Sequence, residues 1–159
     1  MDLHLDYETR CVLDLEEVGL DNYLADPGFE IIMGQYAIDD GKVHLWEPHK
    51  QSQIPAQLED ALLNPFVTAH AHHANFERQV SKRAFGIDKP TTEWVCTMAM
   101  ARYAGLPGSL DDAGEIMGLG LEAKLKTGKE LIRLFCEPVD VGGEDTLFGI
   151  SKPLFNTPY

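Results

Sequence analysis

The chain has 159 residues, enough for one domain with a hydrophobic core, and its 44% hydrophobic content is ordinary for a globular protein. No apolar run approaches a membrane span, and the first residues, MDLHLDYETR, lack the features of a signal peptide, so we expect no membrane association and a cytoplasmic protein. The net charge of −13 opposes non-specific binding to a polyanion. A nucleic-acid ligand would therefore need a local basic patch or metal ions.

The three cysteines, Cys11, Cys96 and Cys136, are odd in number and far apart in the sequence. No CxxC pair is present, so the sequence indicates neither a disulfide framework nor a cysteine-rich zinc site. Unpaired cysteines of this kind are typical of a reducing compartment.

The first part of the chain predicts three strands. Residues 3–8 alternate apolar and polar side chains, which is the pattern of a half-buried strand. Residues 14–28 predict a short helix or an irregular crossing. Within residues 29–48, two β-rich runs flank Asp40-Gly41, a hairpin turn dipeptide, so the last two strands should be antiparallel.

The second part predicts one more strand and several helices, whose spacing of apolar residues is close to 3.6. The strand is expected over residues 66–71, and the helices over residues 55–64, 73–86, 97–105, 109–118 and 121–136. From residue 138 to 159 the sequence is rich in Gly, Pro and Asp and has no clear period. This order of elements suits an α/β domain built on one mixed sheet.

Two acidic side chains, Asp6 and Glu8, share one face of the first predicted strand, roughly 7 Å apart along the chain. Like charges repel at this distance unless a cation lies between them. Mg²⁺ and Mn²⁺ prefer oxygen ligands, and two such ions can clamp a phosphodiester. The alternative is that both residues are ordinary surface acids on a solvent-facing strand.

The segment AHAHHANFER, residues 69–78, runs from a short strand into a helix. His73 and Glu77 are four residues apart and share a helix face, so Glu77 can project towards the first strand as a third carboxylate. Phe76 lies on a neighbouring face and suits core packing. Two alternatives stay open: the histidines cap the helix start, or His70, His72 and His73 bind zinc, although no fourth ligand follows at a recognisable spacing.

A cluster of basic residues lies in the last predicted helix, and its members are Lys124, Lys126, Lys129 and Arg133. Lys126, Lys129 and Arg133 are three and four residues apart, so they share a helix face that could contact a phosphate backbone. The alternative is a solvated helix face.

Five segments together resemble a known family. They are LDYET, FEIIMGQYAIDDGKVHLWEP, AHHANFER, WVCTMAMARYAGLPGSLDDAGEIMGL and GKELIRLFC, in this order over roughly residues 3–138. This combination resembles the 3′–5′ proofreading exonuclease domain of phage-type family-A DNA polymerases, which belong to the DEDD group. The resemblance implies a ribonuclease H-like mixed β-sheet with helices on both faces. It also implies metal-dependent hydrolysis of the terminal phosphodiester of single-stranded DNA.

The resemblance assigns roles to individual residues. Asp6 and Glu8 match the first motif as ligands of a two-metal Mg²⁺ or Mn²⁺ site, and Glu77 matches the third acid. His73 stands where the wider group has Asn. We expect contacts with the 3′ end of the DNA from Tyr7, His73, Phe76, Lys126, Lys129 and Arg133.

The family's third motif, an aromatic residue or His followed by Asp on a late helix, has no match in the sequence. We therefore expect residues 1–137 to form an exonuclease-like domain without its final catalytic helix, and residues 138–159 to form an irregular tail or linker. The alternative function is that of a catalytically incomplete part of a split or interrupted phage polymerase, which acts as a binding or interaction module. A separate polymerase polypeptide would then be a partner, in a bacterial host or phage-infected cell.

Overall fold

The computed structural model describes residues 1–119 and Cys136. The remainder of the predicted helix over 121–136, with its basic residues, and the tail over 138–159 lie outside the described residues. The chain divides into two compact units, one made of Met1–Glu8 with Ile31–Leu125 and the other of Thr9–Glu30 with Lys126–Tyr159. In the described part of the chain, no helix is long and apolar enough to cross a membrane.

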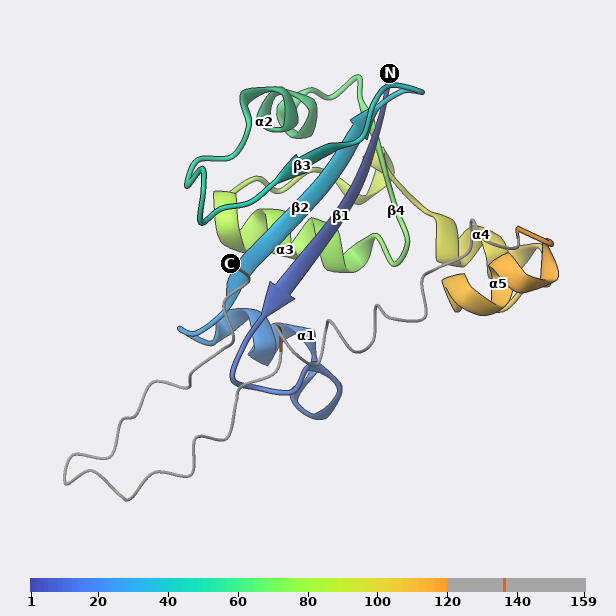
Figure 1. The fold of residues 1–159 in the computed structure, drawn as a ribbon, viewed down its shortest axis with the longest axis horizontal. Helices are drawn as coiled ribbons and strands as arrows, with labels where there is room; N and C mark the ends of the chain where they lie inside the picture. The colour runs from blue at the N-terminus through green and yellow to red at the C-terminus, as the bar shows by residue number, and fades with distance from the viewer. Residues whose placement is uncertain (120–135, 137–159) are drawn as a thin grey trace. The chain divides into compact units, whose positions relative to one another are not determined.

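A five-stranded sheet organises the first unit (Figure 1). Its strands are β1 (Asp2–Arg10), β2 (Glu30–Ile38), β3 (His44–Trp46), β4 (Thr68–Ala71) and β5 (Trp94–Cys96). Their order across the sheet is β3-β2-β1-β4-β5. β2 and β3 are antiparallel, as the Asp40-Gly41 turn predicts, whereas β4 runs parallel to both β1 and β5. The predicted mixed sheet of an α/β protein is therefore confirmed, and β5 is a strand that the sequence analysis missed.

One face of β1 forms the centre of the core. Leu3, Leu5 and Tyr7 are each at most 4% exposed, while Asp6, which points to the other face, is exposed. Two helices, α2 (Ala56–Leu63) and α3 (Asn75–Phe85), follow the predicted ranges closely. Figure 1 shows α3 crossing behind β1 and β2, on the face of the sheet that carries the buried side chains.

Direct contacts join α3 to the sheet. The Tyr7 hydroxyl lies 3.3 Å from Ser81 Oγ, and the Phe85 ring contacts the rings of both Tyr7 and Trp46. Gly34 on β2 has no room for a side chain, because a Cβ there would come within 3.0 Å of Trp46 Cε3. The tight packing of these residues fixes α3 against β1.

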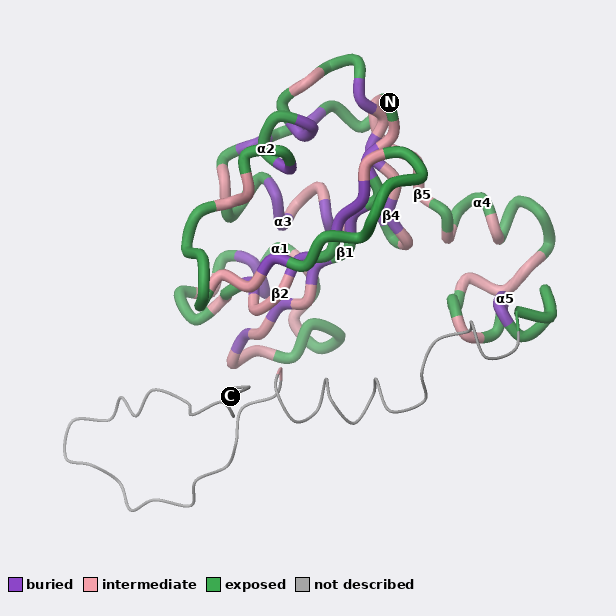
Figure 2. The backbone as a smooth tube through the Cα atoms, turned by 45° about the horizontal axis from the view of Figure 1, so that its top comes forward, coloured by how far each residue is buried: buried purple, intermediate pink, exposed green. Residues whose placement is uncertain are grey.

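The remaining elements of this unit are short. A 3₁₀ turn, η1 (Thr91–Glu93), precedes β5, and α4 (Thr97–Tyr103) and α5 (Leu110–Ile116) follow it. Figure 2 shows that the buried residues concentrate along the strands and α2, whereas α4 contains none.

In the second unit, the described part centres on α1 (Leu15–Ala25), which the sequence predicts as a helix or an irregular crossing. Both descriptions apply, because Gly19 has a left-handed φ of 76° that kinks the helix. The Tyr23 hydroxyl lies 3.0 Å from Thr9 Oγ1, and Arg10 forms an ion pair with Glu30.

Lys89 is a buried lysine that ties the end of α2 to η1. Its side chain is 1% exposed and forms an ion pair with Glu93 at 2.9 Å. Its ammonium donates to the carbonyl of Asn64 at 2.7 Å and, more weakly, to that of Leu62 at 3.5 Å. A buried ammonium is stable only with such partners.

We expect Lys89→Met to lower the free energy of unfolding by roughly 1–3 kcal/mol, because it leaves the Asn64 carbonyl and the Glu93 carboxylate without their donor. Urea unfolding followed by circular dichroism measures the change. Lys82→Met is the matched control, since Lys82 is half exposed in its ion pair with Asp88 and should cost at most about 1 kcal/mol. Equal losses in the two variants would contradict this account of Lys89.

Candidate functional site

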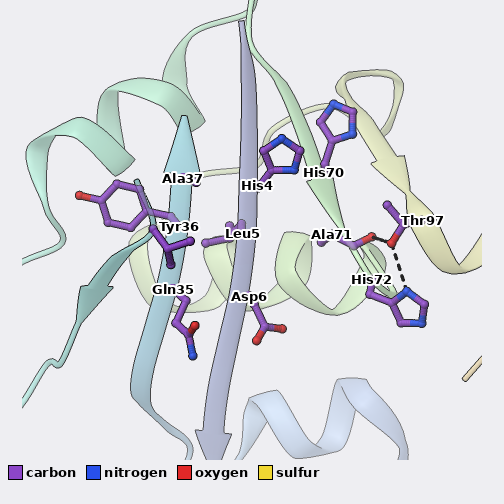
Figure 3. A pocket seen from close by; sticks show the side chains of 11 residues that line it. His4, Leu5, Asp6, Gln35, Tyr36, Ala37, His70, Ala71, His72 and Thr97 are labelled. Carbon is purple, nitrogen blue, oxygen red and sulfur yellow. Dashed lines mark hydrogen bonds between the residues drawn. The ribbon is translucent and has the colours of Figure 1, made fainter. Parts of the chain in front are cut away.

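The position of Asp6 and Glu8 follows from where β4 ends. β4 pairs with β1 in a register that joins His4 to His70, and it ends at Ala71. β1 continues to Arg10, so Asp6 and Glu8 lie beyond this paired part, near the carboxyl ends of the parallel strands. Ligand sites of α/β sheets lie at this edge. Figure 3 shows the Asp6 carboxylate at a pocket on the open face of the sheet.

Glu77 lies in the first turn of α3 and is 3% exposed. Within the described residues, its Oε2 atom is buried without a hydrogen-bond partner. Burial raises the pKa of Glu77 to about 8, and although its own backbone amide lowers this pKa, the charges of Asp6, Cys96 and Glu8 raise it. The three acids predicted from the sequence are therefore coupled electrostatically.

The coupled carboxylates suit a hard divalent cation. A buried carboxylate oxygen without a partner, next to two further acids, is unfavourable until a cation compensates it. Among the described residues, no three His, Cys, Asp or Glu side chains already converge as a set of ligands. Asp6, Glu8 and Glu77 thus have the chemistry of an Mg²⁺ or Mn²⁺ site without a preformed ligand shell.

His73 contributes through its backbone. It is exposed and has a left-handed φ of 78°, a conformation that non-glycine residues rarely adopt and that Asn, Asp and His tolerate best. Its carbonyl accepts a hydrogen bond from the Phe76 amide at 2.8 Å. His73 therefore makes the sharp turn between β4 and α3 that brings Glu77 towards β1, a backbone role that the sequence analysis did not foresee.

The other two histidines of the segment point to different partners. His70 Nε2 donates to Asp2 Oδ1 at 3.1 Å. His72 Nε2 donates to the Gly108 carbonyl at 2.8 Å, and its Nδ1 lies 3.1 Å from the Thr97 hydroxyl. Both ring nitrogens of His72 are thus engaged, which argues against the zinc alternative.

Two residues predicted to contact DNA, Tyr7 and Phe76, differ in how far they are buried. Tyr7 is 4% exposed and faces the core, where burial raises the pKa of its hydroxyl. Its side chain is therefore not available to DNA, and we correct that prediction: alternation along the strand puts Tyr7 on the opposite face from Asp6. Phe76 is half-buried and keeps part of its surface exposed. Lys126, Lys129 and Arg133 lie outside the described residues.

Cys96, at the end of β5, is a part of the site that the sequence analysis missed. Burial alone would raise the pKa of its thiol, but hydrogen bonds from the backbone amides of Ala99, Ala74 and His73 lower it overall. Its charge is one of the causes of the raised pKa of Glu77. No sequence signal marks this cysteine, because its surroundings come from the β4–α3 turn and the start of α4.

Sequence comparison relates the chain to a DNA polymerase. It is 34% identical over 145 residues to the DNA polymerase of Bacillus phage SP02. The aligned residues make up 89% of this chain and 22% of the polymerase. The chain thus spans about a fifth of the length of this relative. No profile of a known protein family matches the chain.

Comparison of structures gives nuclease folds at low sequence identity. Escherichia coli RNase D, an exoribonuclease involved in structured RNA processing, has a TM-score of 0.54 and 18% identity, over 81% of this chain and 30% of RNase D. Brucella melitensis NrnC with bound Mg²⁺ has a TM-score of 0.54 and 17% identity, over 80% of this chain and 56% of NrnC. Brucella melitensis NrnC bound to pGG has a TM-score of 0.53 and 19% identity, over 79% of this chain and 54% of NrnC.

Sequence and structure thus point to the same group of proteins. The phage relative and the exonuclease-like folds agree with the family that the five sequence segments resemble. The chain is a homologue of part of a phage DNA polymerase, and its α/β fold is like that of exonucleases of known structure such as RNase D.

Proposed function

We propose that this chain is a metal-dependent 3′–5′ exonuclease domain that hydrolyses the terminal phosphodiester of single-stranded DNA. One observation carries the proposal: the buried Glu77 carboxyl group is coupled to Asp6 and Glu8 at the carboxyl end of the central strand. Three acids at this position supply carboxylate oxygens of the kind that hold the ions of two-metal chemistry.

In the proposed reaction, the oxygen of a water molecule attacks the phosphorus of the last phosphodiester. The bond from phosphorus to the 3′ oxygen breaks, which leaves a 3′-hydroxyl on the shortened strand and releases a nucleoside 5′-monophosphate. Asp6, Glu8 and Glu77 would hold Mg²⁺ or Mn²⁺, which when bound lowers the pKa of water and stabilises the charge on the leaving oxygen. His73 positions Glu77 through the turn that starts α3.

The comparisons support this proposal without deciding the substrate. NrnC binds Mg²⁺ and pGG, RNase D is an exoribonuclease, and the sequence relative is a DNA polymerase. The polymerase relative is the reason that we choose DNA over RNA, since it is 34% identical whereas the nucleases are below 20%. A phage relative also agrees with a site of action in the cytoplasm of an infected bacterium.

A second candidate is a binding or interaction module that works with a separate polymerase polypeptide. The observation that favours it is the 34% identity of the chain to part of a phage DNA polymerase. In this case the chain would bind the 3′ end of the DNA and its partner would complete the catalytic residues.

We expect the chain to shorten 5′-labelled single-stranded DNA stepwise from its 3′ end when Mg²⁺ or Mn²⁺ is present. Asp6→Asn and Glu8→Gln should each lower the rate by at least about 100-fold, because mutation of groups that only support metal ligands already costs 10–100-fold. Gel electrophoresis of the labelled strand measures both the rate and the direction, and a strand of the same sequence in RNA tests the choice of DNA.

Asp60→Asn is the control for this assay, because Asp60 is an exposed acid on α2. Its rate should equal that of the unmodified chain. If folded protein binds the DNA with metal present and leaves it intact, the exonuclease proposal fails and the binding module is favoured.

Glu77 should make the stability of the protein depend on pH when EDTA removes divalent ions. Its pKa is about 8 in the folded state and about 4.5 when unfolded, so between these values the folded state retains a proton that the unfolded state loses. Stability from this group is therefore fully present below about pH 4.5 and is lost as the pH rises towards 8, by up to about 1.4 kcal/mol per pH unit.

We expect Glu77→Gln to remove this slope and to be more stable than the unmodified chain at pH 8 in EDTA. Urea unfolding between pH 5 and 8 tests the expectation, with Glu59→Gln, an exposed glutamate on α2, as control. Parallel pH profiles for the unmodified chain and Glu77→Gln would show that Glu77 is not buried as described.

A further inference from the structure

A pocket of about 260 Å³ lies on the open face of the sheet next to Asp6. Its lining comes from β1, β2 and β4, from the residues that follow β2 and β4, and from the start of α4. The lining residues that bear on its chemistry are His4, Asp6, Gln35, His70 and His72. None of them except Asp6 has a role in the proposed reaction.

Two imidazole rings form an aromatic surface in this pocket. The rings of His4 and His70 stack with centroids 5.1 Å apart and an angle of 30° between their planes. A hydrogen bond from His70 Nε2 to Asp2 fixes the second ring, and His4 is exposed. Figure 3 shows the two rings side by side above Asp6. Planar rings held in this way are suited to stacking with another flat ring.

The polar groups of the pocket are suited to an uncharged ligand. Among the described residues, the lining of the pocket includes no Lys or Arg. The negative charge of the Asp6 carboxylate would repel a phosphate group inside the pocket. The exposed Gln35 amide offers a donor and an acceptor in one plane, which is the pattern that reads the edge of a nucleobase. The two nitrogens of His72 are engaged by Gly108 and Thr97, so His72 shapes the wall of the pocket.

The size of the pocket also favours a small ligand. Its volume lies below the roughly 300–1,000 Å³ of sites that enclose drug-sized molecules. One base fits this space better than a stack of several nucleotides.

We infer that this pocket binds the base of the terminal nucleotide of a single strand, stacked on the His4–His70 pair and contacted at its edge by Gln35. The inference rests on the proposed function, because the Asp6 side of the pocket would then face the bond that is cleaved. It adds residues of base recognition that lie apart from the acids.

The test uses a short single-stranded DNA with 2-aminopurine as its 3′-terminal base, joined by a phosphorothioate to slow hydrolysis. The emission of this base falls when it stacks on an aromatic ring. With Mg²⁺ present, titration of the unmodified chain should quench it. His4→Ala and His70→Ala should weaken binding by about 5- to 100-fold, which is the range for loss of one base–aromatic stack.

Two further variants separate stacking from folding. His70→Phe keeps a ring and loses the Asp2 hydrogen bond, so it should retain most of the quenching. His49→Ala is the control, because His49 is exposed and does not line the pocket. A strand with an abasic 3′ end should bind equally to the unmodified chain and to His70→Ala.

The outcomes distinguish this inference from the proposed function. Hydrolysis of an ordinary strand with unchanged quenching in His4→Ala and His70→Ala would overturn the base pocket and leave the exonuclease proposal standing. Quenching that both variants lose, in a chain without hydrolysis, would support the pocket and overturn the exonuclease. Equal quenching from a terminal and an internal 2-aminopurine would also overturn the pocket as a site for the terminal base.

Discussion

The parallel pairing of β4 with β1 is the constraint on which the rest of the site depends. The pairing brings His70 beside His4, and β4 ends one residue later, while β1 runs on through Asp6 and Glu8. The chain then reverses direction through His73 and enters α3. A longer β4 would cover the edge of β1 where the acids lie, and a looser turn would move Glu77 away from them.

The burial of Glu77 makes its ionised carboxylate unfavourable, and a cation bound beside it would compensate this charge. An acid whose pKa is raised to about 8 holds its proton at neutral pH, and its ionised form is unfavourable beside Asp6 and Glu8. The helix that carries Glu77 is packed into the core, where Val80 and Ser81 are at most 1% exposed. This packing keeps the Glu77 carboxyl group away from solvent. A rigid helix that holds one acid in the core next to two others is an arrangement expected at a functional site rather than in a core selected for stability alone.

Local rules predicted much of the fold. Alternation gave β1, the Asp40-Gly41 turn gave the hairpin, and α3 ends at Gly86, which has the left-handed φ of 71° typical of a helix end. β5 was missed because three residues have no measurable period, and Trp94–Cys96 becomes a strand only through pairing with β4. The placement of Tyr7 against α3 follows from the same alternation that places Asp6, so Tyr7 faces the core rather than DNA.

The site was predictable in its residue types but not in its environment. Spacing alone suggests that Glu77 approaches the first strand, whereas its burial depends on contacts between α3 and the sheet that no local pattern contains. Lys89 and Cys96 were missed for the same reason: their partners come from segments distant in the sequence or from backbone amides. Tertiary contacts of this kind override the usual expectation that a lysine is exposed.

The histidines show how one local change of conformation separates the roles of adjacent residues. His70 still belongs to β4 and lies on the open face with His4, His72 turns towards Gly108, and His73 has the left-handed conformation that starts the helix. A count of histidines suggests a zinc site, but the rings of His70 and His72 bond to different partners, Asp2 and Gly108. On a chain with a net charge of −13, the exposed face beside Asp6 then offers imidazole rings and an amide. Under the proposed function, such a face suits the base of a nucleotide, while the negative phosphate of that nucleotide needs a cation that the three acids would hold.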